Sequence, residues 1–516
     1  MNALKRARIL IAMAGASMLA FAPLANAEFG LIDGYYPDNE GYTLFAPYRG
    51  TSAYLIDHEG RLINRWEDPD GYSAGGAMFL SDRGTLVRAT LVGNSGNAGA
   101  GAGGLIREYS WYGKVFWEFV YDDVDAWQHH DIVLMPNGNV MITAFERVIL
   151  DETTGSCRNQ YGEINRSGSA TEGVAFDHLI EVKPDYKTGG AEIVWEWHLC
   201  DHLGANDPGK WDPARPQNFN SLDYNPYRDQ ILIGCNFCNE LFIIDHSVDS
   251  EEAQGPAGDF MYRWGNPQNY GAGTAEDQRL GFNHTVRFIT NEFGFNLANN
   301  KKRNMKLPGR NGFGNIIAYN NTHEVNGPCA NGNVGAPDSP ICSAIIEITP
   351  PYDKDSNSYE QPPAGLPFAP ADFSSVVQNI VDGTGNRDFD SRFLSSGQKL
   401  YYNRVSINVG AGRPVTEFFI TDSAGDVQWH YVPPAFSFNP GRTGGGDKAP
   451  DLCMTADAAA LPAGGTQWPF RAIRYEQRFK GFKHVPIKRG PLLTDVEPLE
   501  GLDYGPCPTV EYMYPR

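Results

Sequence analysis

The sequence has few long hydrophobic runs, and this limits the structures that it can form. After residue 27, no stretch holds the ~20 consecutive apolar residues that a membrane-spanning helix requires. Long amphipathic helical patterns are scarce as well. We therefore expect no membrane span and little helix.

Positive charge is also in short supply. Lys and Arg number 42 against 62 Asp and Glu, which gives a formal net charge of −20. A surface of this sign repels nucleic acid and anionic lipid. We expect no basic patch on the protein and no nucleic-acid partner.

Phosphate-binding fingerprints are missing too. No Walker or Rossmann motif occurs. The glycine-rich stretch "NAGAGAGG", residues 97–104, is not followed by a helical pattern, so it offers no helix N-terminus to hold a phosphate. We interpret it as a flexible loop.

The first 27 residues have the pattern of a secretory signal peptide. They hold a basic start, "MNALKRAR", then an apolar run, then "ANA", a small-residue cleavage site. Cleavage is expected after Ala27, which predicts a soluble protein that is periplasmic or secreted.

All eight cysteines follow this segment, and an even count in an exported protein predicts disulfides. Pairing of neighbours would join residues 157 to 200, 329 to 342 and 453 to 507. Cys235 and Cys238 lie three apart, so a bond between them needs a bulge or a turn. A structural zinc site is disfavoured because it would need a second cysteine pair at ligand spacing.

The residues that are plentiful point to an all-β fold. Short Val, Ile, Leu and Tyr runs alternate with turn signals across a chain that holds 57 Gly and 35 Pro. A three-part unit recurs, and its middle part is the clearest: "YLIDHEG" at 54, "LIREYSWYG" at 105, "HLIEVKP" at 178, "LFIIDHS" at 241, "AIIEITP" at 344 and "EFFITDSAG" at 417.

Six such units predict a six-bladed β-propeller over residues 28–449, since radial stacking buries faces that no unit can bury alone. A flat two-sheet sandwich fits six units poorly. The stretches 146–175, 200–220 and 320–343 are expected to be long inter-strand insertions on one rim. In unit six the first strand is placed at 397, and "SSVVQNI" at 374 is the candidate outer strand of unit five. Residues 450–516 form a C-terminal extension packed on the propeller, or they close a blade.

Polar side chains recur just where successive units enter their innermost strand. Unit three offers His129, His130 and Asp131, and the next three units offer "NFNS" at 218, "FNHT" at 282 and "FDSR" at 389. Because these positions converge on the propeller axis, a functional role is favoured for His284 and for the histidine pair. The pair could also hold a metal, but adjacent residues on a strand face opposite ways, so both would not serve easily.

Four long segments of the sequence resemble one protein family. "GYTLFAPYRGTSAYLIDHEGRLINRW", "HHDIVLMPNGN", "FNSLDYNPYRDQILI" and "YRWGNPQNYGAGTAEDQRLGFNH" are similar to the bacterial arylsulfotransferases that work without PAPS. The resemblance covers most of 41 to 435. It implies a six-bladed propeller that moves a sulfo group from a phenolic sulfate to a phenol acceptor through a sulfohistidine, with no cofactor.

The resemblance also assigns roles to residues. His284 falls at the family's nucleophile, and His130, with His129 beside it, would assist. Asn218 stands where the family has a histidine, and Asn236 or Cys235 where it has an arginine; Arg392 is the expected compensating cation. The expected substrate-binding residues are Asn218, Asn220, Asn236, Arg392 and Asp131.

Two other functions stay open at this point. Because two cationic groups of the family are replaced, the chain could be a non-catalytic propeller that binds an aromatic or anionic ligand. The pair Cys235 and Cys238 could instead serve redox or metal chemistry in a different enzyme. The sequence leaves open a structural calcium ion and a homodimer.

Overall fold

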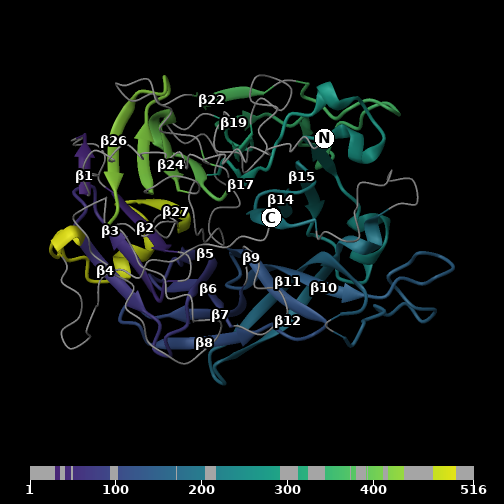
Figure 1. Ribbon diagram of the computed structural model, residues 1–516, viewed down its shortest axis with the longest axis horizontal. Helices are drawn as coiled ribbons and strands as arrows, with labels where there is room; N and C mark the ends of the chain where they lie inside the picture. The colour runs from purple at the N-terminus through teal and green to yellow at the C-terminus, as the bar shows by residue number, and fades with distance from the viewer. Residues whose placement is uncertain are drawn as a thin grey trace, which may run out of the picture.

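The computed structural model describes residues 30–34, 41–47, 50–92, 101, 103–169, 171–203, 217–290, 312–322, 343–371, 373–378, 391, 393–410, 416–434 and 469–495. Six antiparallel sheets stand around a common centre, with one edge strand of each near the axis and the other at the rim (Figure 1). The predicted six-bladed β-propeller is therefore confirmed.

Blades two to five are each built from strands that follow one another in the sequence, starting at the axis and ending at the rim. Blade two holds β5 (Ala74–Leu80), β6 (Leu86–Leu91), β7 (Gly104–Tyr109) and β8 (Val115–Val120). Blade three holds β9 (Ala126–Leu134), β10 (Val140–Val148), β11 (Val174–Asp185) and β12 (Gly190–His198). Blade four holds β13 (Phe219–Asn225), β14 (Gln230–Cys235), β15 (Glu240–Asp245) and β16 (Tyr262–Trp264). Blade five holds β17 (His284–Phe288), β18 (Ile316–Asn320), β19 (Ala344–Ile348) and β22 (Ser374–Gln378), with the small hairpin β20 (Tyr352–Asp353) and β21 (Ser358–Tyr359) between the last two.

Blades one and six are completed by the two ends of the described chain. Blade one holds β27 (Pro469–Glu476), β2 (Gly41–Pro47), β3 (Ser52–Ile56) and β4 (Leu62–Glu67). Blade six holds β23 (Ser396–Lys399), β24 (Val405–Val409), β25 (Glu417–Thr421), β26 (Val427–Val432) and, outermost, β1 (Gly30–Asp33). The innermost strand of blade one thus comes from the segment after residue 449, so the propeller extends beyond the boundary that we expected there.

The first strand that was placed at 397 in unit six lies in β23, the innermost strand of blade six, and β24 is the second strand. The candidate outer strand at 374 is confirmed as β22.

Burial along the strands follows their place in a blade. Every described residue of β5 and β17 is buried, because inner strands face neighbouring blades on both sides. The outer strand β8 alternates, with the rim-side residues exposed and Trp117 buried. Helix is confined, within the described ranges, to short 3-10 turns: η1 (Leu199–His202), η2 (Glu252–Gln254), η3 (Pro256–Gly258), η4 (Pro267–Tyr270), η5 (Ala275–Asp277), η6 (Tyr401–Asn403), η8 (Lys480–His484) and η9 (Leu493–Asp495).

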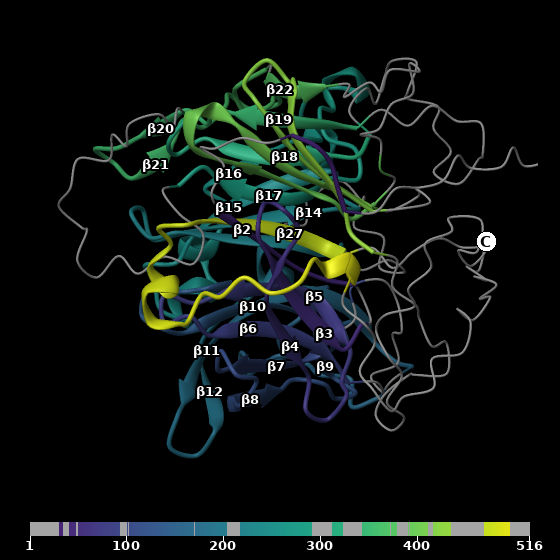
Figure 2. The same cartoon turned by 90° about the vertical axis from the view of Figure 1, so that its left-hand side faces the viewer.

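After β27 the chain forms a strap across the outside of blades one and two (Figure 2). Its Lys480 pairs with Asp82 at 3.1 Å, and Arg489 pairs with Asp57 at 3.2 Å. The strap exposes six basic side chains within twelve residues, Arg478, Lys480, Lys483, His484, Lys488 and Arg489. The expectation that the acidic chain carries no basic patch is therefore wrong for this segment.

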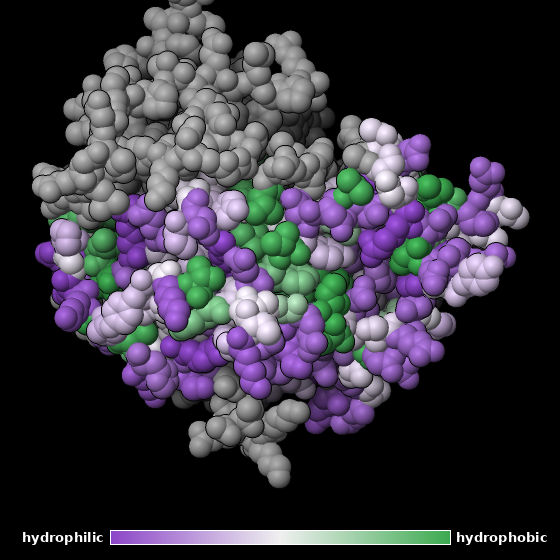
Figure 3. Space-filling view, turned by 90° about the horizontal axis from the view of Figure 1, so that it is seen from below, coloured by the Kyte–Doolittle hydropathy of each residue, from purple (hydrophilic) through white to green (hydrophobic). Residues whose placement is uncertain are grey.

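Two of the predicted disulfides are present, Cys157–Cys200 and Cys235–Cys238. The other four cysteines lie outside the described residues, as do the predicted signal peptide and most of residues 320–343. In the part of the chain that is described, no helix has the length and apolar character to cross a membrane. The face seen in Figure 3 is mostly hydrophilic, with hydrophobic residues in small separate groups.

Candidate functional site

The histidine pair lies on a bulge, which changes where its side chains point. The pairing of β9 with β10 shifts register between Ile142 and Ala144, so three residues of β9 lie opposite Thr143. The Thr143 hydroxyl accepts the N–H of Asp131 at 3.0 Å and donates to the carbonyl of His129 at 2.5 Å. His130 adopts a left-handed backbone, with φ 44°. The rule of alternation therefore fails, and the two imidazoles meet instead of facing apart.

Within this pair the rings are held in a row. Nδ1 of His129 lies 2.8 Å from Nδ1 of His130, and Nε2 of His129 lies 3.0 Å from Oδ1 of Asp177. The His129 ring also stacks on Phe145, with centroids 3.7 Å apart. Burial lowers the pKa of His130 well below its usual value, and the nearby His129 and His284 lower it further.

A glycine makes room for His130. The carbonyl of Gly101 accepts the His130 N–H at 2.6 Å, and Gly101 has φ +86°. A Cβ at Gly101 would lie 2.1 Å from Nε2 of His130, so no larger residue fits. At this residue the glycine-rich stretch supports a site histidine, a role that our loop interpretation did not foresee.

His284 begins β17 and presents one ring nitrogen without a partner. Its Nδ1 lies 2.9 Å from the carbonyl of Phe282 and 2.8 Å from Oδ1 of Asn321. Both are acceptors, so Nδ1 carries the proton and Nε2 the lone pair. No described residue hydrogen-bonds Nε2. Burial lowers the pKa of His284 to about 4; the two hydrogen bonds act in the opposite direction, and the charge of Arg471 adds to the lowering.

The turn that carries the Cys235–Cys238 disulfide holds the backbone before His284. Nδ2 of Asn236, inside the turn, donates to the carbonyl of Asn283 at 3.1 Å and lies 3.5 Å from Nδ1 of His284. Oδ1 of Asn239 accepts the N–H of Phe282 at 2.7 Å. The predicted substrate-binding residue Asn236 thus contacts the His284 loop itself.

Several side-chain amide atoms at the starts of β13 and β17 are buried and have no hydrogen-bond partner among the described residues. Asn220 donates to the Asn283 carbonyl at 2.9 Å, but its Oδ1 is unpaired, and so are Oδ1 of Asn218 and both polar side-chain atoms of Asn283. Leaving such a group unpaired costs roughly 1–3 kcal/mol. These amides therefore indicate a place for water or a polar ligand.

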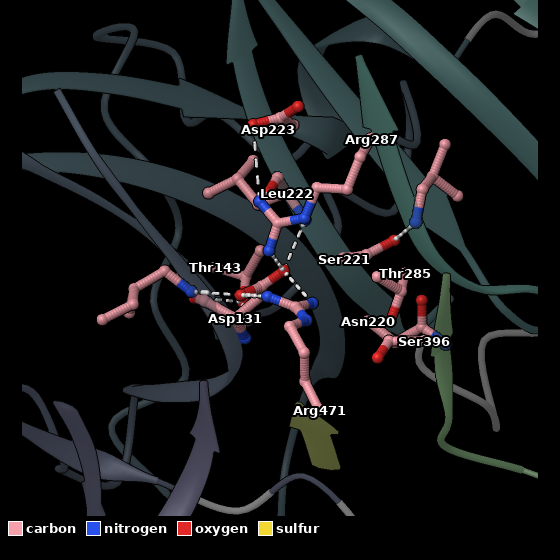
Figure 4. A network of polar contacts seen from close by, with 12 residues as sticks. Asp131, Thr143, Asn220, Ser221, Leu222, Asp223, Thr285, Arg287, Ser396 and Arg471 are labelled. Carbon is pink, nitrogen blue, oxygen red and sulfur yellow. Dashed lines mark hydrogen bonds and ion pairs between the residues drawn. The ribbon is translucent and has the colours of Figure 1, made fainter. Parts of the chain in front are cut away.

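Asp131 ties the inner strands together through its carboxylate (Figure 4). Its carboxylate is fully buried and accepts Nη1 and Nη2 of Arg471 at 2.9 and 2.7 Å. It also accepts the N–H of Leu222 at 2.8 Å, and Nη2 of Arg287 lies 3.4 Å away. These contacts join β9, β13, β17 and β27, so the residue predicted to bind substrate has both oxygens engaged within the protein.

Two buried arginines at the axis were not predicted. Arg287 follows His284 by three residues, and Arg471 lies on β27, which the repeat did not include. Nε of Arg471 is buried and has no hydrogen-bond partner in the part of the chain that the structure describes. Burial, and then the charge of Arg287, lower the pKa of Arg471. The predicted cation Arg392 lies outside the described residues. A search for basic residues on the predicted innermost strands would have found Arg287 but not Arg471, because the repeat did not mark β27 as an innermost strand.

The site thus combines two neutral imidazoles, a row of amides and an arginine pair. Among the described residues, no three His, Cys, Asp or Glu side chains are placed to hold a metal ion together.

Comparison with known proteins assigns the chain to no family. No family model matches the chain, and no curated protein matches it. A putative 6-phosphogluconolactonase from Bacteroides fragilis is 8% identical over 86% of this chain and 100% of its own, with a TM-score of 0.37. The β-propeller domain of Cps50 (Swd1) from Myceliophteria thermophila is 10% identical over 78% of this chain and 88% of its own, with a TM-score of 0.31. Scores this low carry no argument about function.

Proposed function

We propose that this protein transfers a sulfo group from a phenolic sulfate ester to a phenol acceptor, with His284 as the nucleophile. The observation that carries the proposal is the neutral imidazole of His284, whose Nδ1–H is bound to Phe282 and Asn321 while no described residue pairs with Nε2. An imidazole in this state can attack an electrophile and later leave. The groups around His284 are buried and polar, which suits the binding of a small charged substrate.

Nε2 of His284 forms a bond to sulfur while the bond from sulfur to the aryl oxygen breaks, and the phenolate leaves with the electron pair. The acceptor oxygen then attacks the same sulfur, the bond from sulfur to His284 breaks, and the acceptor loses its proton to a base. We assign this base to His130, a neutral imidazole that interacts electrostatically with His284.

The developing negative charge on the sulfo oxygens needs donors. Nε of Arg471 is buried and unpaired, and its charge already acts on His284. The amide groups of Asn218, Asn220 and Asn283 add neutral hydrogen-bonding capacity. One such donor is worth about 3–4 kcal/mol at an oxyanion site. Arg471 would thus supply the cationic group that Asn218 and Asn236 do not.

Turnover with p-nitrophenyl sulfate and phenol tests the proposal, followed by the release of nitrophenolate. We expect turnover by the wild type and loss of it in His284→Ala. The matched control is His430→Ala, because His430 pairs with Glu417 in blade six, away from the site. Equal rates in wild type and His284→Ala would refute the proposal. No turnover with any aryl sulfate, together with saturable binding of one, would favour a ligand-binding propeller, which the unpaired amides also suit.

A further inference from the structure

We propose that Asp177 is a positioning residue that fixes the tautomers of His129 and His130, so that Nε2 of His130 acts as the base toward the acceptor hydroxyl. The kinetic part of this inference rests on the proposed sulfo transfer. The tautomers themselves can be measured without any substrate, so the two ideas can fail separately.

Of the pair His129 and His130, Asp177 contacts only His129. It lies fully buried on β11, and its carboxylate accepts the N–H of Phe219 at Oδ1 and the N–H of Asn218 at Oδ2, both at 2.8 Å. Its remaining close neighbour is Nε2 of His129, at 3.0 Å from Oδ1. The contact is a close charge contact and is not aligned as a hydrogen bond; a carboxylate at this distance repels a lone pair and attracts an N–H, so we place the proton of His129 on Nε2.

The order of the other protons follows from this one. With its proton on Nε2, His129 has its lone pair on Nδ1, 2.8 Å from Nδ1 of His130. Nδ1 of His130 must then donate, which leaves the lone pair of His130 on Nε2. The stack on Phe145 at 3.7 Å fixes the plane of the His129 ring and so keeps the row aligned.

With its lone pair on Nε2, His130 can remove a proton from the acceptor hydroxyl but cannot donate one from that nitrogen. As the acceptor oxygen bonds to sulfur, its proton moves to Nε2 of His130, and the electron pair of the breaking nitrogen–sulfur bond returns to His284. The new imidazolium is stabilised through His129 by the charge of Asp177. In the first step a neutral His130 has no proton on Nε2 for the leaving phenolate. Donors with acidic phenols should therefore react best.

Nitrogen-15 NMR of the histidine rings in the full-length protein tests the tautomers. We expect His130 to show a protonated Nδ1 and an unprotonated Nε2 in the wild type, and a mixture of tautomers in Asp177→Asn. The control is Asp259→Asn, which removes the carboxylate 2.9 Å from Nδ1 of His202, outside this row, and should leave His130 unchanged. A wild-type His130 with its proton on Nε2 would overturn the inference even if Asp177→Asn fails to fold.

Half-reaction kinetics test the role. In Asp177→Asn, sulfo-enzyme formation from p-nitrophenyl sulfate should change less than about 3-fold, whereas its discharge to phenol should slow about 100-fold or more, as expected when a base is lost. The pH dependence of discharge should change as well. Equal slowing of both half-reactions would indicate a structural role and contradict the inference. If the wild type forms no sulfo-enzyme, the proposed function fails, and the NMR result still decides the tautomers.

Discussion

Replacing Asp131 by Asn should destabilise the propeller strongly, because its carboxylate contacts two buried guanidinium groups, that of Arg471 and that of Arg287, which Asp223 also contacts at 3.4 Å. The Asp131 carboxylate accepts Arg471 at 2.9 and 2.7 Å, lies 3.4 Å from Arg287 and accepts two backbone N–H groups, those of Ile132 and Leu222, at 2.8 Å each. Asn keeps the shape but removes the charge, and its Nδ2 turns a donor toward groups that need an acceptor. Breaking one partner of a buried ion pair costs about 3–5 kcal/mol.

A second bidentate pair supplies the control for this prediction. Arg158 holds Asp201 at 2.8 and 2.7 Å, but the Arg158 side chain is 18% exposed, against 3% for Arg471. Water can therefore replace much of the interaction that Asp201→Asn removes, and we expect the free energy of unfolding to fall by about 1 kcal/mol.

Urea unfolding followed by tryptophan fluorescence measures both variants. We expect the midpoint of Asp131→Asn to fall several times further than that of Asp201→Asn. The double variant Asp131→Asn with Arg471→Met should regain part of the loss, since one uncompensated charge is then removed. Equal shifts in the two single variants, or a double variant less stable than Asp131→Asn, would refute the reasoning.

Two further predictions concern rates. Burial lowers the pKa of His284 to about 4, so its imidazole is neutral at neutral pH. We therefore expect kcat/KM for p-nitrophenyl sulfate to fall only as the pH drops toward about 4. A fall centred near the ordinary histidine pKa of about 6.5 would contradict this prediction. Replacing Cys235 and Cys238 together by Ser should loosen the turn before His284 and slow transfer, by up to about 100-fold for a shift near 1 Å. The same change at Cys157 and Cys200 should leave the rate within about 3-fold, and equal effects of the two double variants would show that the turn has no special role.

The fold could be predicted because the propeller repeats one simple pattern. Each blade needs apolar alternating strands separated by turns, and these leave a local signature such as "LFIIDHS" at 241, which forms β15. What failed was the closure of the ring. β27 joins blade one although it lies more than 400 residues from β2, and no local pattern marks which distant strand completes a sheet.

The site could be predicted in part. His284, His129 and His130 were chosen because the sequence placed them where innermost strands start. His284 does begin β17, whereas the other two lie within β9, and all three are buried. The contact between the two adjacent histidines could not be foreseen, since it depends on a bulge that breaks the alternation of a strand. Asp177 was missed for a related reason. It lies on the third strand of its blade and reaches the row only across β10.

For Asp131, the position predicted from the sequence was correct, but its partners were not predicted. Its position at the axis was expected, but its partner Arg471 comes from β27. The Asp131 carboxylate, which was predicted to bind substrate, thus binds the strand that closes the ring of blades. Its role follows from the long-range closure, which the sequence pattern does not encode locally.

The most direct test is the intact mass of the protein after mixing with p-nitrophenyl sulfate in the absence of a phenol acceptor. We predict a gain equal to one SO3 group, located on His284 by peptide mapping, lost on addition of phenol and absent in His284→Ala. Nitrophenolate release with no mass gain, or a sulfo group on another residue, would contradict the account.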